Sequence, residues 1–485
     1  MSCVFSFYIS EESIEIKELP RRYAFGKYTL QTNDSTPYMS ACLDDRECSI
    51  FGLAINVASE DTDNPAEVIA KTCHDISDVL EYEKNLGGKY IILYRNGGQY
   101  YLLGDATCSI PVSYTVYGKF ACSSNSQYIV KQYGYKPCEQ LQKIRSSGDI
   151  SQALPYDITV YKELKQLIPN HYLEIDTKSA VRFVNAEYAQ NVLSVDEATQ
   201  LVEPMIEKLY EYYHSLYKLY CPITSGRDSR VVLAYLMQDP KVQCYTIRHR
   251  EHREEEQDIV IPKELCDRNY LSYEQIKDAV VSEKSKCEMD CLLGKGMYSM
   301  RTLQIAETIK EHYLDGAVIN GDIIGQVGKC SLHRDISGAF AKPGYFRCKL
   351  HNYSREAKEE LKLWLQEIDR SGECVNRFDL FSIENRMGRW AAQENLIYNS
   401  LGQIYLNIFN SRSIIYIWTA VSRKERKNSS LHIGLIERKS PGLLEIPFEA
   451  DNSLAVRLAK KNGITYLLST YAKYWSQSMK FKLGK

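Results

Sequence analysis

The most informative stretch of the chain is residues 219–236, which read LYCPITSGRDSRVVLAYL. Leu219 to Ile223 form a short apolar run that is typical of a buried strand, and Val231 to Leu236 have the character of a helix. Small and polar residues join the two. A loop of this kind can bring backbone N–H groups together at the positive end of the helix. The pattern predicts a phosphate-binding loop at residues 224–229.

Each residue type in this loop has a chemical reason to be there. Gly226 permits a close backbone approach, Thr224 and Ser229 can donate hydrogen bonds, and Asp228 can hold Mg²⁺. The loop is not a Walker loop, because the pattern Gly-x-x-x-x-Gly-Lys-Ser/Thr is absent. A simple helix cap uses the same residue types, so these six residues alone leave both interpretations open.

Strands and helices alternate after this loop. We expect strands at 242–247 and 317–319 and a helix over about Met300 to His312, and a capping-box pattern at residues 194–197 opens a long amphipathic helix before the loop. Alternating strands and helices predict a parallel sheet, whose ligands bind beyond the carboxyl ends of the strands. The loops at 224–229 and 320–325 should therefore share one rim.

Residues 1–190 have a different pattern, in which short strands follow one another. Tyr90–Tyr94 and Tyr100–Leu103 flank Asn96-Gly97, which predicts a hairpin with a type I′ turn. Further strand pairs are expected at Val112–Thr115 with Phe120–Cys122, and at Tyr172–Ile175 with Val181–Phe183. The chain thus divides into a β-rich domain over 1–190 and an α/β domain over 194–485.

Composition sets outer limits on function. The chain has 485 residues, 44% hydrophobic and 25% charged, which is typical of a globular protein with substantial cores. The 60 Lys+Arg nearly balance the 62 Asp+Glu, so no broad basic surface for nucleic acid or an anionic membrane is expected. The longest apolar run, residues 414–421, is too short to cross a bilayer. The start lacks signal-peptide features, and the 15 scattered cysteines indicate reduced thiols, so we expect a cytoplasmic protein.

Taken together, these motifs resemble the asparagine synthetase family. The loop is similar to the family's pyrophosphate loop Ser-Gly-Gly-x-Asp-Ser: Gly226, Asp228 and Ser229 match, while Thr224 and Ser225 replace the first Ser and the first Gly. The resemblance covers most of the chain. Further matching stretches are Leu86–Tyr90, Gly104–Asp105, Pro111–Tyr114, Phe120–Ser124, Leu167–Leu173, Tyr245–Ile247 with Glu256 and Asp258, Val318–Asp322, Asn407–Asn410 and Pro441–Pro447.

The resemblance implies a two-domain fold. The first domain would be glutaminase-like, with the αββα layers of N-terminal-nucleophile hydrolases, and the second a doubly wound parallel α/β sheet of the adenine-nucleotide α-hydrolase type with added helices. The implied activity is that of an ATP-dependent carbon–nitrogen ligase. A carboxylate would form an acyl-adenylate with loss of pyrophosphate, and ammonia or an amine would then displace AMP.

The partners implied are small molecules. The acceptor would be a small-molecule, peptide or glycan carboxylate, with free aspartate and asparagine biosynthesis as the default. The resemblance leaves a homodimer open. The alternative is a catalytically inactive ATP-binding or scaffold protein that retains the fold.

The resemblance also assigns site residues. Asp228, Asp322 and Lys427 are the catalytic candidates: the two carboxylates would hold Mg²⁺, and the lysine would offset charge on the leaving pyrophosphate. Contacts with ATP and pyrophosphate are expected from Thr224, Ser225, Gly226, Arg227, Ser229, Thr246, Ile247 and Gly321.

The roles of the basic residues are open at this point. Lys427 belongs to a basic cluster at residues 423–427 that could also be a solvated face. Arg227 and Arg230 flank the loop, where a phosphate contact and a surface salt bridge are equally compatible with the sequence.

Two positions depart from the family. Ser2 stands where glutamine-dependent members have a Cys whose free α-amino group serves as the base, and Cys3 cannot take over because its nitrogen is in a peptide bond. We therefore expect no glutaminase activity, and ammonia or a substrate amine as the nucleophile. Gly325 stands where a second Mg²⁺-binding Asp is expected, so Asp322 is the remaining carboxylate of that loop.

Three other clusters invite a functional interpretation. Cys287, Cys291, Cys330 and His333 could form a zinc site, although their wide separation favours ordinary buried cysteines. Glu384 could deprotonate an amine, but an ion pair with Arg386 or Arg389 fits its position better. The tyrosines at residues 210–220 indicate a core and domain interface rather than a base-stacking platform.

Overall fold

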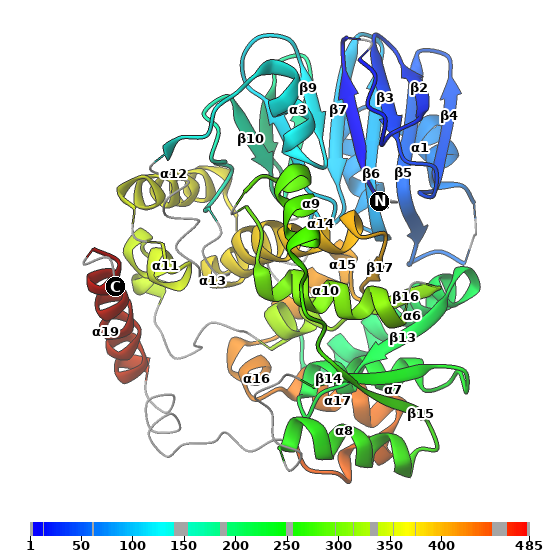
Figure 1. The fold of residues 1–485 in the computed structure, drawn as a ribbon. Helices are drawn as coiled ribbons and strands as arrows, with labels where there is room; N and C mark the ends of the chain where they lie inside the picture. Colours follow the sequence, from blue (N-terminus) through cyan, green and yellow to red (C-terminus); the bar gives the residue numbers. More distant parts are fainter. Residues whose placement is uncertain are drawn as a thin grey trace.

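The fold is described from a computed structural model of the 485-residue chain. The structure describes residues 3–12, 14–60, 63–139, 154–184, 192–248, 256–295, 297–313, 315–329, 338–352, 354–373, 375–448 and 463–482. Ser2, Cys330 and His333 lie outside these ranges, so the predictions made on them remain predictions. Within the ranges, two antiparallel sheets, one parallel sheet and many helices form a mixed α/β protein (Figure 1).

The first antiparallel sheet has the strand order β10-β8-β9-β1-β3-β2. Its strands are β1 (Phe7–Ser10), β2 (Arg21–Phe25), β3 (Tyr28–Thr32), β8 (Val112–Thr115), β9 (Ala121–Ser123) and β10 (Leu164–Leu167). The second antiparallel sheet has the order β12-β11-β7-β6-β5-β4. Its strands are β4 (Tyr38–Leu43), β5 (Arg46–Asn56), β6 (Leu86–Asn96), β7 (Gln99–Gly104), β11 (His171–Glu174) and β12 (Ser179–Arg182).

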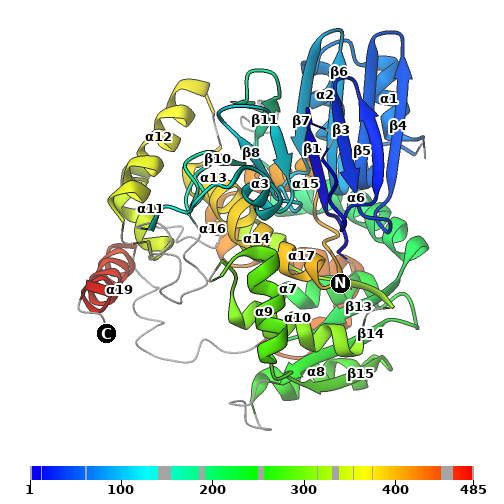
Figure 2. The same ribbon diagram turned by 45° about the horizontal axis from the view of Figure 1, so that its top comes forward.

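The two antiparallel sheets pack face to face through buried apolar side chains. Leu30 of one sheet and Leu93 of the other belong to one cluster, and the rings of Phe7 and Phe51 meet edge to face at 5.8 Å. The other face of the second sheet packs on α1 (Pro65–Thr72) and α2 (Ile76–Glu83), and α3 (Ser126–Tyr133) packs on the first sheet. The N-terminal part therefore has α, β, β and α layers, with α1 and α2 beside β4–β6 at the upper right of Figure 2.

The predicted strand pairs of this part are confirmed. Strand β8 pairs with β9, β11 pairs with β12, and β6 pairs with β7. The turn of the last hairpin was predicted one residue too early. Asn96 pairs with Gln99, so the turn residues are Gly97 and Gly98, and Gly97 takes the positive φ of 56° that a side chain would oppose.

The third sheet is parallel and has the order β15-β14-β13-β16-β17. Its strands are β13 (Lys218–Pro222), β14 (Gln243–Arg248), β15 (Ser272–Lys277), β16 (Gly316–Ile319) and β17 (Ile404–Leu406), and all neighbouring pairs are parallel. The chain moves outward from β13 to β15 and then returns to β16 on the other side of β13. The strand order thus reverses between β13 and β16, where doubly wound sheets open a crevice for ligands.

One group of helices surrounds this sheet, and a second group lies farther from it. Those nearer the sheet are α6 (Val195–Leu216), α7 (Arg227–Leu236), α8 (Gln257–Arg268), α9 (Glu283–Leu293), α10 (Met300–His312), the π-helix η1 (Ile324–Gly328), α14 (Ala392–Ser400), α15 (Arg412–Ala420), α16 (Arg423–Lys427) and α17 (Ser430–Lys439). The others are α11 (Pro343–Lys349), α12 (Arg355–Ser371), α13 (Arg377–Leu380), the π-helix η3 (Phe381–Ala391) and α19 (Gly463–Lys482). Figure 1 shows α11, α12 and α19 at the left, away from the parallel sheet.

The helix signals of the sequence are confirmed. The capping box at Ser194 opens α6. The Ser194 hydroxyl accepts a hydrogen bond from the Glu197 N–H, and the Glu197 carboxylate accepts one from the Ser194 N–H. Helix α10 has the predicted limits. In the part of the chain that the structure describes, no helix combines the length and apolar character that crossing a bilayer requires.

The β-sandwich contacts the parallel-sheet part through buried polar groups. Gly88 and Asn410 exchange hydrogen bonds of 2.9 and 2.6 Å, and Arg412 donates to both oxygens of Glu83 at 2.8 and 3.1 Å. Apolar residues of both parts also belong to one continuous core cluster. The division into domains at residues 190–194 stays a prediction, because much of the chain at the boundary lies outside the described ranges.

A buried amine, Lys89 of β6, lies at this interface. Its Nζ donates to Oδ1 of Asn395, Oδ1 of Asn399 and the carbonyl oxygen of Tyr405, all at 3.0–3.1 Å. The side chain is 2% exposed, and the described residues offer it no ion pair. Burial lowers the pKa of Lys89 to about 7.

We predict that Lys89→Met flattens the pH dependence of stability. The unfolded chain keeps the lysine proton up to about pH 10, whereas the folded chain releases it near pH 7, so the free energy of unfolding rises with pH across this window. Urea unfolding at about pH 7 and about pH 9 should show the natural chain gaining on the order of 2 kcal/mol more than the variant.

Lys263→Met provides the control for this experiment, because Lys263 is an exposed residue of α8. This control should follow the natural chain at both pH values. Equal gains in the natural chain and in Lys89→Met would show that the buried amine does not titrate in this range.

Candidate functional site

Two loops meet where the strand order of the parallel sheet reverses. One joins β13 to α7, and the other joins β16 to η1. A Cβ added to Gly321 would lie 3.0 Å from the backbone oxygen of Asp228, and one added to Gly325 would lie 2.7 Å from Oδ2 of Asp228. The second loop therefore packs directly on Asp228, and the two glycines make this approach possible.

The first loop is held by its own hydroxyl groups. Thr224 N–H donates to Oγ of Ser229 at 3.1 Å, and Gly226 N–H donates to Oγ1 of Thr224 at 3.2 Å. Ser225 donates from both N–H and Oγ to Asp258 of α8, at 3.0 and 2.5 Å. Gly226 is the N-cap of α7 and brings no side chain to the first N–H groups of that helix, which suits an anion-binding end.

Asp228 is placed between cationic groups. Its Oδ1 accepts a hydrogen bond of 2.9 Å from Nε2 of His432, a completely buried residue of α17, and lies 3.8 Å from Nζ of Lys329. Burial opposes ionisation of this carboxyl. The hydrogen bond from His432 and the charges of His432, Lys329 and Arg227 nevertheless hold the pKa of Asp228 below its usual value. Asp228 is therefore an ionised, oriented carboxylate.

The charge of Asp228 acts on a second carboxyl, Asp322, and the charge of Asp322 acts on a third, Glu394. Asp322 is half-buried after β16, where its N–H donates to Oδ1 of Asn320 at 3.0 Å. Burial, and then the charge of Asp228, raises the pKa of Asp322 to about 6. Glu394 of α14 accepts a hydrogen bond of 2.8 Å from Thr302, and burial followed by the charge of Asp322 raises the pKa of Glu394 to about 7. The sequence prediction did not include Glu394, since it belongs to no motif.

The predicted loop residues come together, whereas two strand residues have another position. The residues gathered at the two loops are Thr224, Ser225, Gly226, Arg227, Asp228, Ser229, Gly321 and Asp322. Thr246 is buried, and its hydroxyl donates to the carbonyl oxygen of Ile223 at 2.7 Å, so it joins β14 to the base of the first loop. Ile247 packs beside Tyr245 and Ile276. A role for either residue in binding ATP stays a prediction.

The basic residues near the loop have distinct surroundings. Arg227 lies over the ring of Phe448 at 4.7 Å. Arg230 is fully buried and donates to the carbonyl oxygens of Leu443 and Ile446 at 3.0 and 2.5 Å. Both alternatives that the sequence offered for Arg230 are wrong, because it is neither at the surface nor directed at the loop. It instead holds the segment after α17 against α7.

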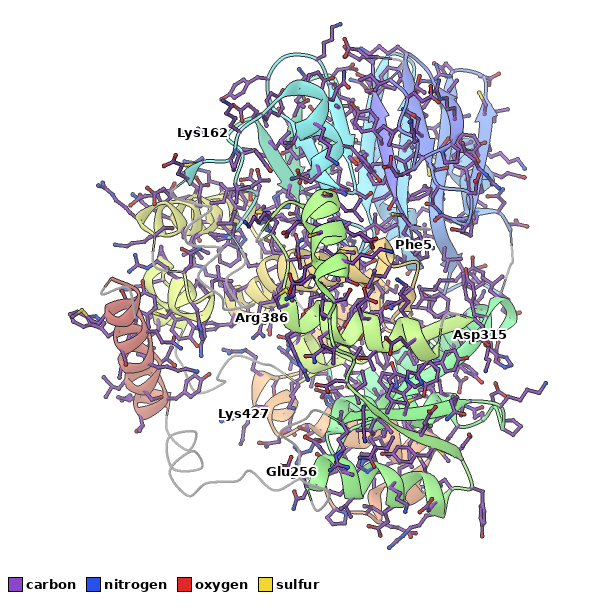
Figure 3. All side chains as sticks on the ribbon, viewed as in Figure 1. Phe5, Lys162, Glu256, Asp315, Arg386 and Lys427 are labelled. Atoms are coloured by element: carbon purple, nitrogen blue, oxygen red, sulfur yellow. The ribbon has the colours of Figure 1, made fainter. Side chains whose placement is uncertain are left out.

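Lys329, which no sequence motif marked, is a lysine that approaches Asp228. Lys427, the predicted cation, is the half-buried last residue of α16 and is labelled beside that helix in Figure 3. Its role stays a prediction.

Glu384 has a structural role in an ion pair, which the sequence favoured over the role of a base. Arg182 donates to both of its oxygens at 2.8 and 2.7 Å, and Nε1 of Trp364 donates at 2.6 Å. Burial opposes its ionisation, but Arg182 holds the pKa of Glu384 below the usual value. The predicted ion pair exists with a different partner: Arg389 donates to the carbonyl oxygens of residues 154 and 158, and Arg386 lies over Trp390.

Cys287 and Cys291 differ from the buried cysteines that the sequence favoured, whereas the tyrosines agree with the prediction. Cys287 and Cys291 are exposed, and in the described ranges no three His, Cys, Asp or Glu side chains gather closely enough to hold a metal. Cys3 is buried with its thiol 3.9 Å from the carbonyl oxygen of Ser400, and burial raises the pKa of the thiol. Such a thiol is a weak nucleophile. Tyr210 and Tyr213 lie in the core, as predicted.

Comparison with known proteins finds likeness among solved structures and none in sequence. No protein-family model matches the chain, and no curated protein matches it in sequence. Among solved structures it is similar to NMN synthetase from Francisella tularensis, with 12% sequence identity over 37% of this chain and 74% of that chain, at a TM-score of 0.19. A likeness at this score does not establish a shared fold or function.

We predict that Arg182→Met destabilises the protein by about 3–5 kcal/mol, because it leaves the Glu384 carboxylate buried without a counter-ion. The double variant Arg182→Met/Glu384→Met should recover part of this loss, since it carries no unpaired buried charge. Chemical denaturation measures both changes.

Arg21→Met is the matched control. Arg21 pairs with Asp34 at 3.1 Å on the surface, where removal of the pair should leave the stability nearly unchanged. If Arg182→Met proved as mild as Arg21→Met, the Glu384 carboxylate would not depend on Arg182.

Proposed function

We propose that the chain is an ATP-dependent ligase of the asparagine synthetase type, which joins a carboxylate to ammonia or an amine. One observation carries the proposal: Asp228 lies at the amino end of α7, against the glycines of the second loop, where the strand order reverses. This is the position at which a doubly wound sheet binds a nucleotide. Thr224, Ser225, Gly226 and Ser229 would bind the pyrophosphate portion.

The proposed reaction has two steps. An acceptor carboxylate oxygen bonds to the α-phosphorus of ATP while the bond to pyrophosphate breaks. The amine nitrogen then bonds to the acyl carbon, AMP leaves, and the nitrogen loses a proton. Lys329, 3.8 Å from Asp228, is placed to offset negative charge as pyrophosphate leaves.

The residues present fit Mg²⁺ as an ion shared with the phosphates of ATP. Mg²⁺ commonly takes one or two carboxylates and completes its shell with phosphate oxygens and water. Asp228 and Asp322 would hold the ion. When bound, Mg²⁺ supplies charge neutralisation on the phosphates.

Glu394 is the residue suited to receive the amine's proton. A base is most effective when its pKa lies near the working pH, and burial raises the pKa of Glu394 to about 7. The charge of Asp322 acts on Glu394, so Glu394 is close enough to the proposed site to interact with it electrostatically. We assign it to proton transfer in place of Glu384.

The β-sandwich over 1–190 would then be a glutaminase-like domain without glutaminase activity, joined to an ATP-binding domain over 194–485. The buried thiol of Cys3 supports this assignment, because its raised pKa keeps it protonated. The amine donor would reach the site as free ammonia or as a substrate amine.

We predict that the natural chain binds ATP in the presence of Mg²⁺ and that Asp228→Ala weakens binding at least about tenfold. The loss is expected because the variant removes the carboxylate that both loops surround. Calorimetry with ATP and Mg²⁺ measures the effect, and release of pyrophosphate with a panel of carboxylates tests the reaction.

Asp267→Asn is the control, because Asp267 is an exposed carboxylate of α8 in the same part of the chain. It should bind ATP as the natural chain does. A folded natural chain that binds no ATP would refute the ligase and leave the scaffold alternative.

A second prediction concerns the glycine that departs from the family. Gly325→Ala should weaken the binding of ATP with Mg²⁺ by about tenfold, since its Cβ would lie 2.7 Å from Oδ2 of Asp228 and one of the two must move. Gly338→Ala is the control, because a Cβ there meets nothing within 4 Å. Unchanged binding in Gly325→Ala would place the nucleotide away from Asp228.

A further inference from the structure

A cluster of cations lies where α11, η3 and α19 meet. Lys349 ends α11, Arg386 lies in η3, and Lys473 belongs to α19. Nζ of Lys349 donates to the hydroxyl of Tyr466 at 2.6 Å and lies 3.5 Å from Oγ1 of Thr470, so α19 is fixed beside α11. Figure 3 places Arg386 in the middle of the molecule, between the helices at the left and the parallel-sheet part.

Among the described residues, these cations have no counter-ion. In the part of the chain that the structure describes, no carboxylate pairs with Lys349, Arg386 or Lys473. Lys349 and Arg386 are half-buried. Burial, and then the charges of Arg386 and Lys473, lower the pKa of Lys349 to about 8. The charges of Arg386 and Lys473 therefore oppose the charge of Lys349.

Several other buried cations among the described residues donate to oxygen atoms of the protein. Arg182, Arg412 and Arg426 each donate to a carboxylate, respectively Glu384, Glu83 and Asp379. Lys89 and Arg230 donate to amide or carbonyl oxygens. Arg386 instead meets the face of Trp390, at 5.7 Å, and its N–H donors have no acceptor among the described residues. A guanidinium in this state is suited to an oxygen-rich anion.

A buried hydroxyl adds to the cluster. The ring of Tyr345 lies 5.5 Å from Nζ of Lys349, and the hydroxyl of Tyr345 is buried without a hydrogen-bond partner in the described ranges. The charge of Arg423 also acts on Tyr345. The Tyr345 hydroxyl is therefore a further buried donor in this region that an anion could satisfy.

One helix connects this cluster to the carboxyls of the proposed site. Arg386, Trp390 and Glu394 follow one another at four-residue spacing along η3 and α14, which are continuous. Residues four apart are neighbours on a helix surface, so the three side chains lie along one side of the continuous helix. The cation cluster and Glu394 thus mark the two ends of one helix side, with Trp390 between them.

We propose that Lys349, Arg386 and Lys473 bind a phosphate or carboxylate group at the far end of the acceptor, while its reacting carboxylate lies near Asp322 and Glu394. The acceptor is then an extended molecule with an anionic group at each end. The identity of this ligand as the acceptor rests on the proposed function. The anion site itself does not.

Calorimetry with two probes, inorganic phosphate and citrate, in Mg²⁺-free buffer of low ionic strength tests the anion site. We expect saturable binding of at least one probe, weakened at least tenfold in Arg386→Gln and in Lys349→Gln. Lys424→Gln, an exposed residue of α16, is the matched control and should bind as the natural chain does. Arg386→Lys should retain part of the affinity, because it keeps the charge and loses the planar donor fork.

The outcomes are distinguishable. Tighter binding of phosphate points to a phosphorylated acceptor, and tighter binding of citrate to a polycarboxylate. Phosphate that binds at the loop of Asp228 would be unaffected by Arg386→Gln, and that result, or no saturable binding by the folded chain, overturns the proposal. Circular dichroism confirms that both glutamine variants fold.

Failure of the anion site and failure of the ligase give different results. If ATP does not bind but phosphate binding depends on Arg386, the anion site stands and the ligase does not. If ATP binds and neither probe depends on Arg386, the ligase stands and the anion site does not.

Discussion

The ion pair between Arg182 and Glu384 is the constraint on which the arrangement of the candidate site depends. Two charges can leave water only because they meet each other, with Trp364 and Asn170 donating to the same carboxylate. The pair joins β12 of the sandwich to η3. Because η3 continues into α14, it also sets the direction of the helix that carries Arg386 and Glu394. The sandwich thus acts as a rigid support for a helix that faces the parallel sheet.

The strand order of the parallel sheet brings together the two loops that form the other part of the site. This order brings the carboxyl ends of β13 and β16 together, and the two loops that follow must therefore pack on each other. Gly321 and Gly325 let this contact close around Asp228, while His432 and Lys329 keep its carboxylate ionised. Oriented negative charge and a helix amino end consequently share one small region.

Local signals made most of the fold predictable. The apolar runs of β13 and β16, the capping box of α6 and the polar loop at 224–229 each lie within a few residues, and all were read from the sequence. Arg182 and Glu384 are 202 residues apart, and nothing local marks them as partners. His432, Lys329 and Glu394 were missed for the same reason. The prediction for Arg230 was wrong because of its position around the helix. Arg230 lies two residues after Asp228, about 200° around α7, and therefore faces the core.

Gly325, which stands where the family that the sequence resembles has a carboxylate, is compatible with the proposed site. A carboxylate there would begin 2.7 Å from Oδ2 of Asp228, in surroundings where burial and Asp228 already raise the pKa of Asp322 to about 6. Like charges this close cannot all ionise, so a third carboxyl would be protonated or would displace Asp228. With glycine at this position, Asp228 stays ionised against His432 and Lys329. The balance of charge around Asp228, rather than the number of carboxylates, decides whether phosphates can be held there.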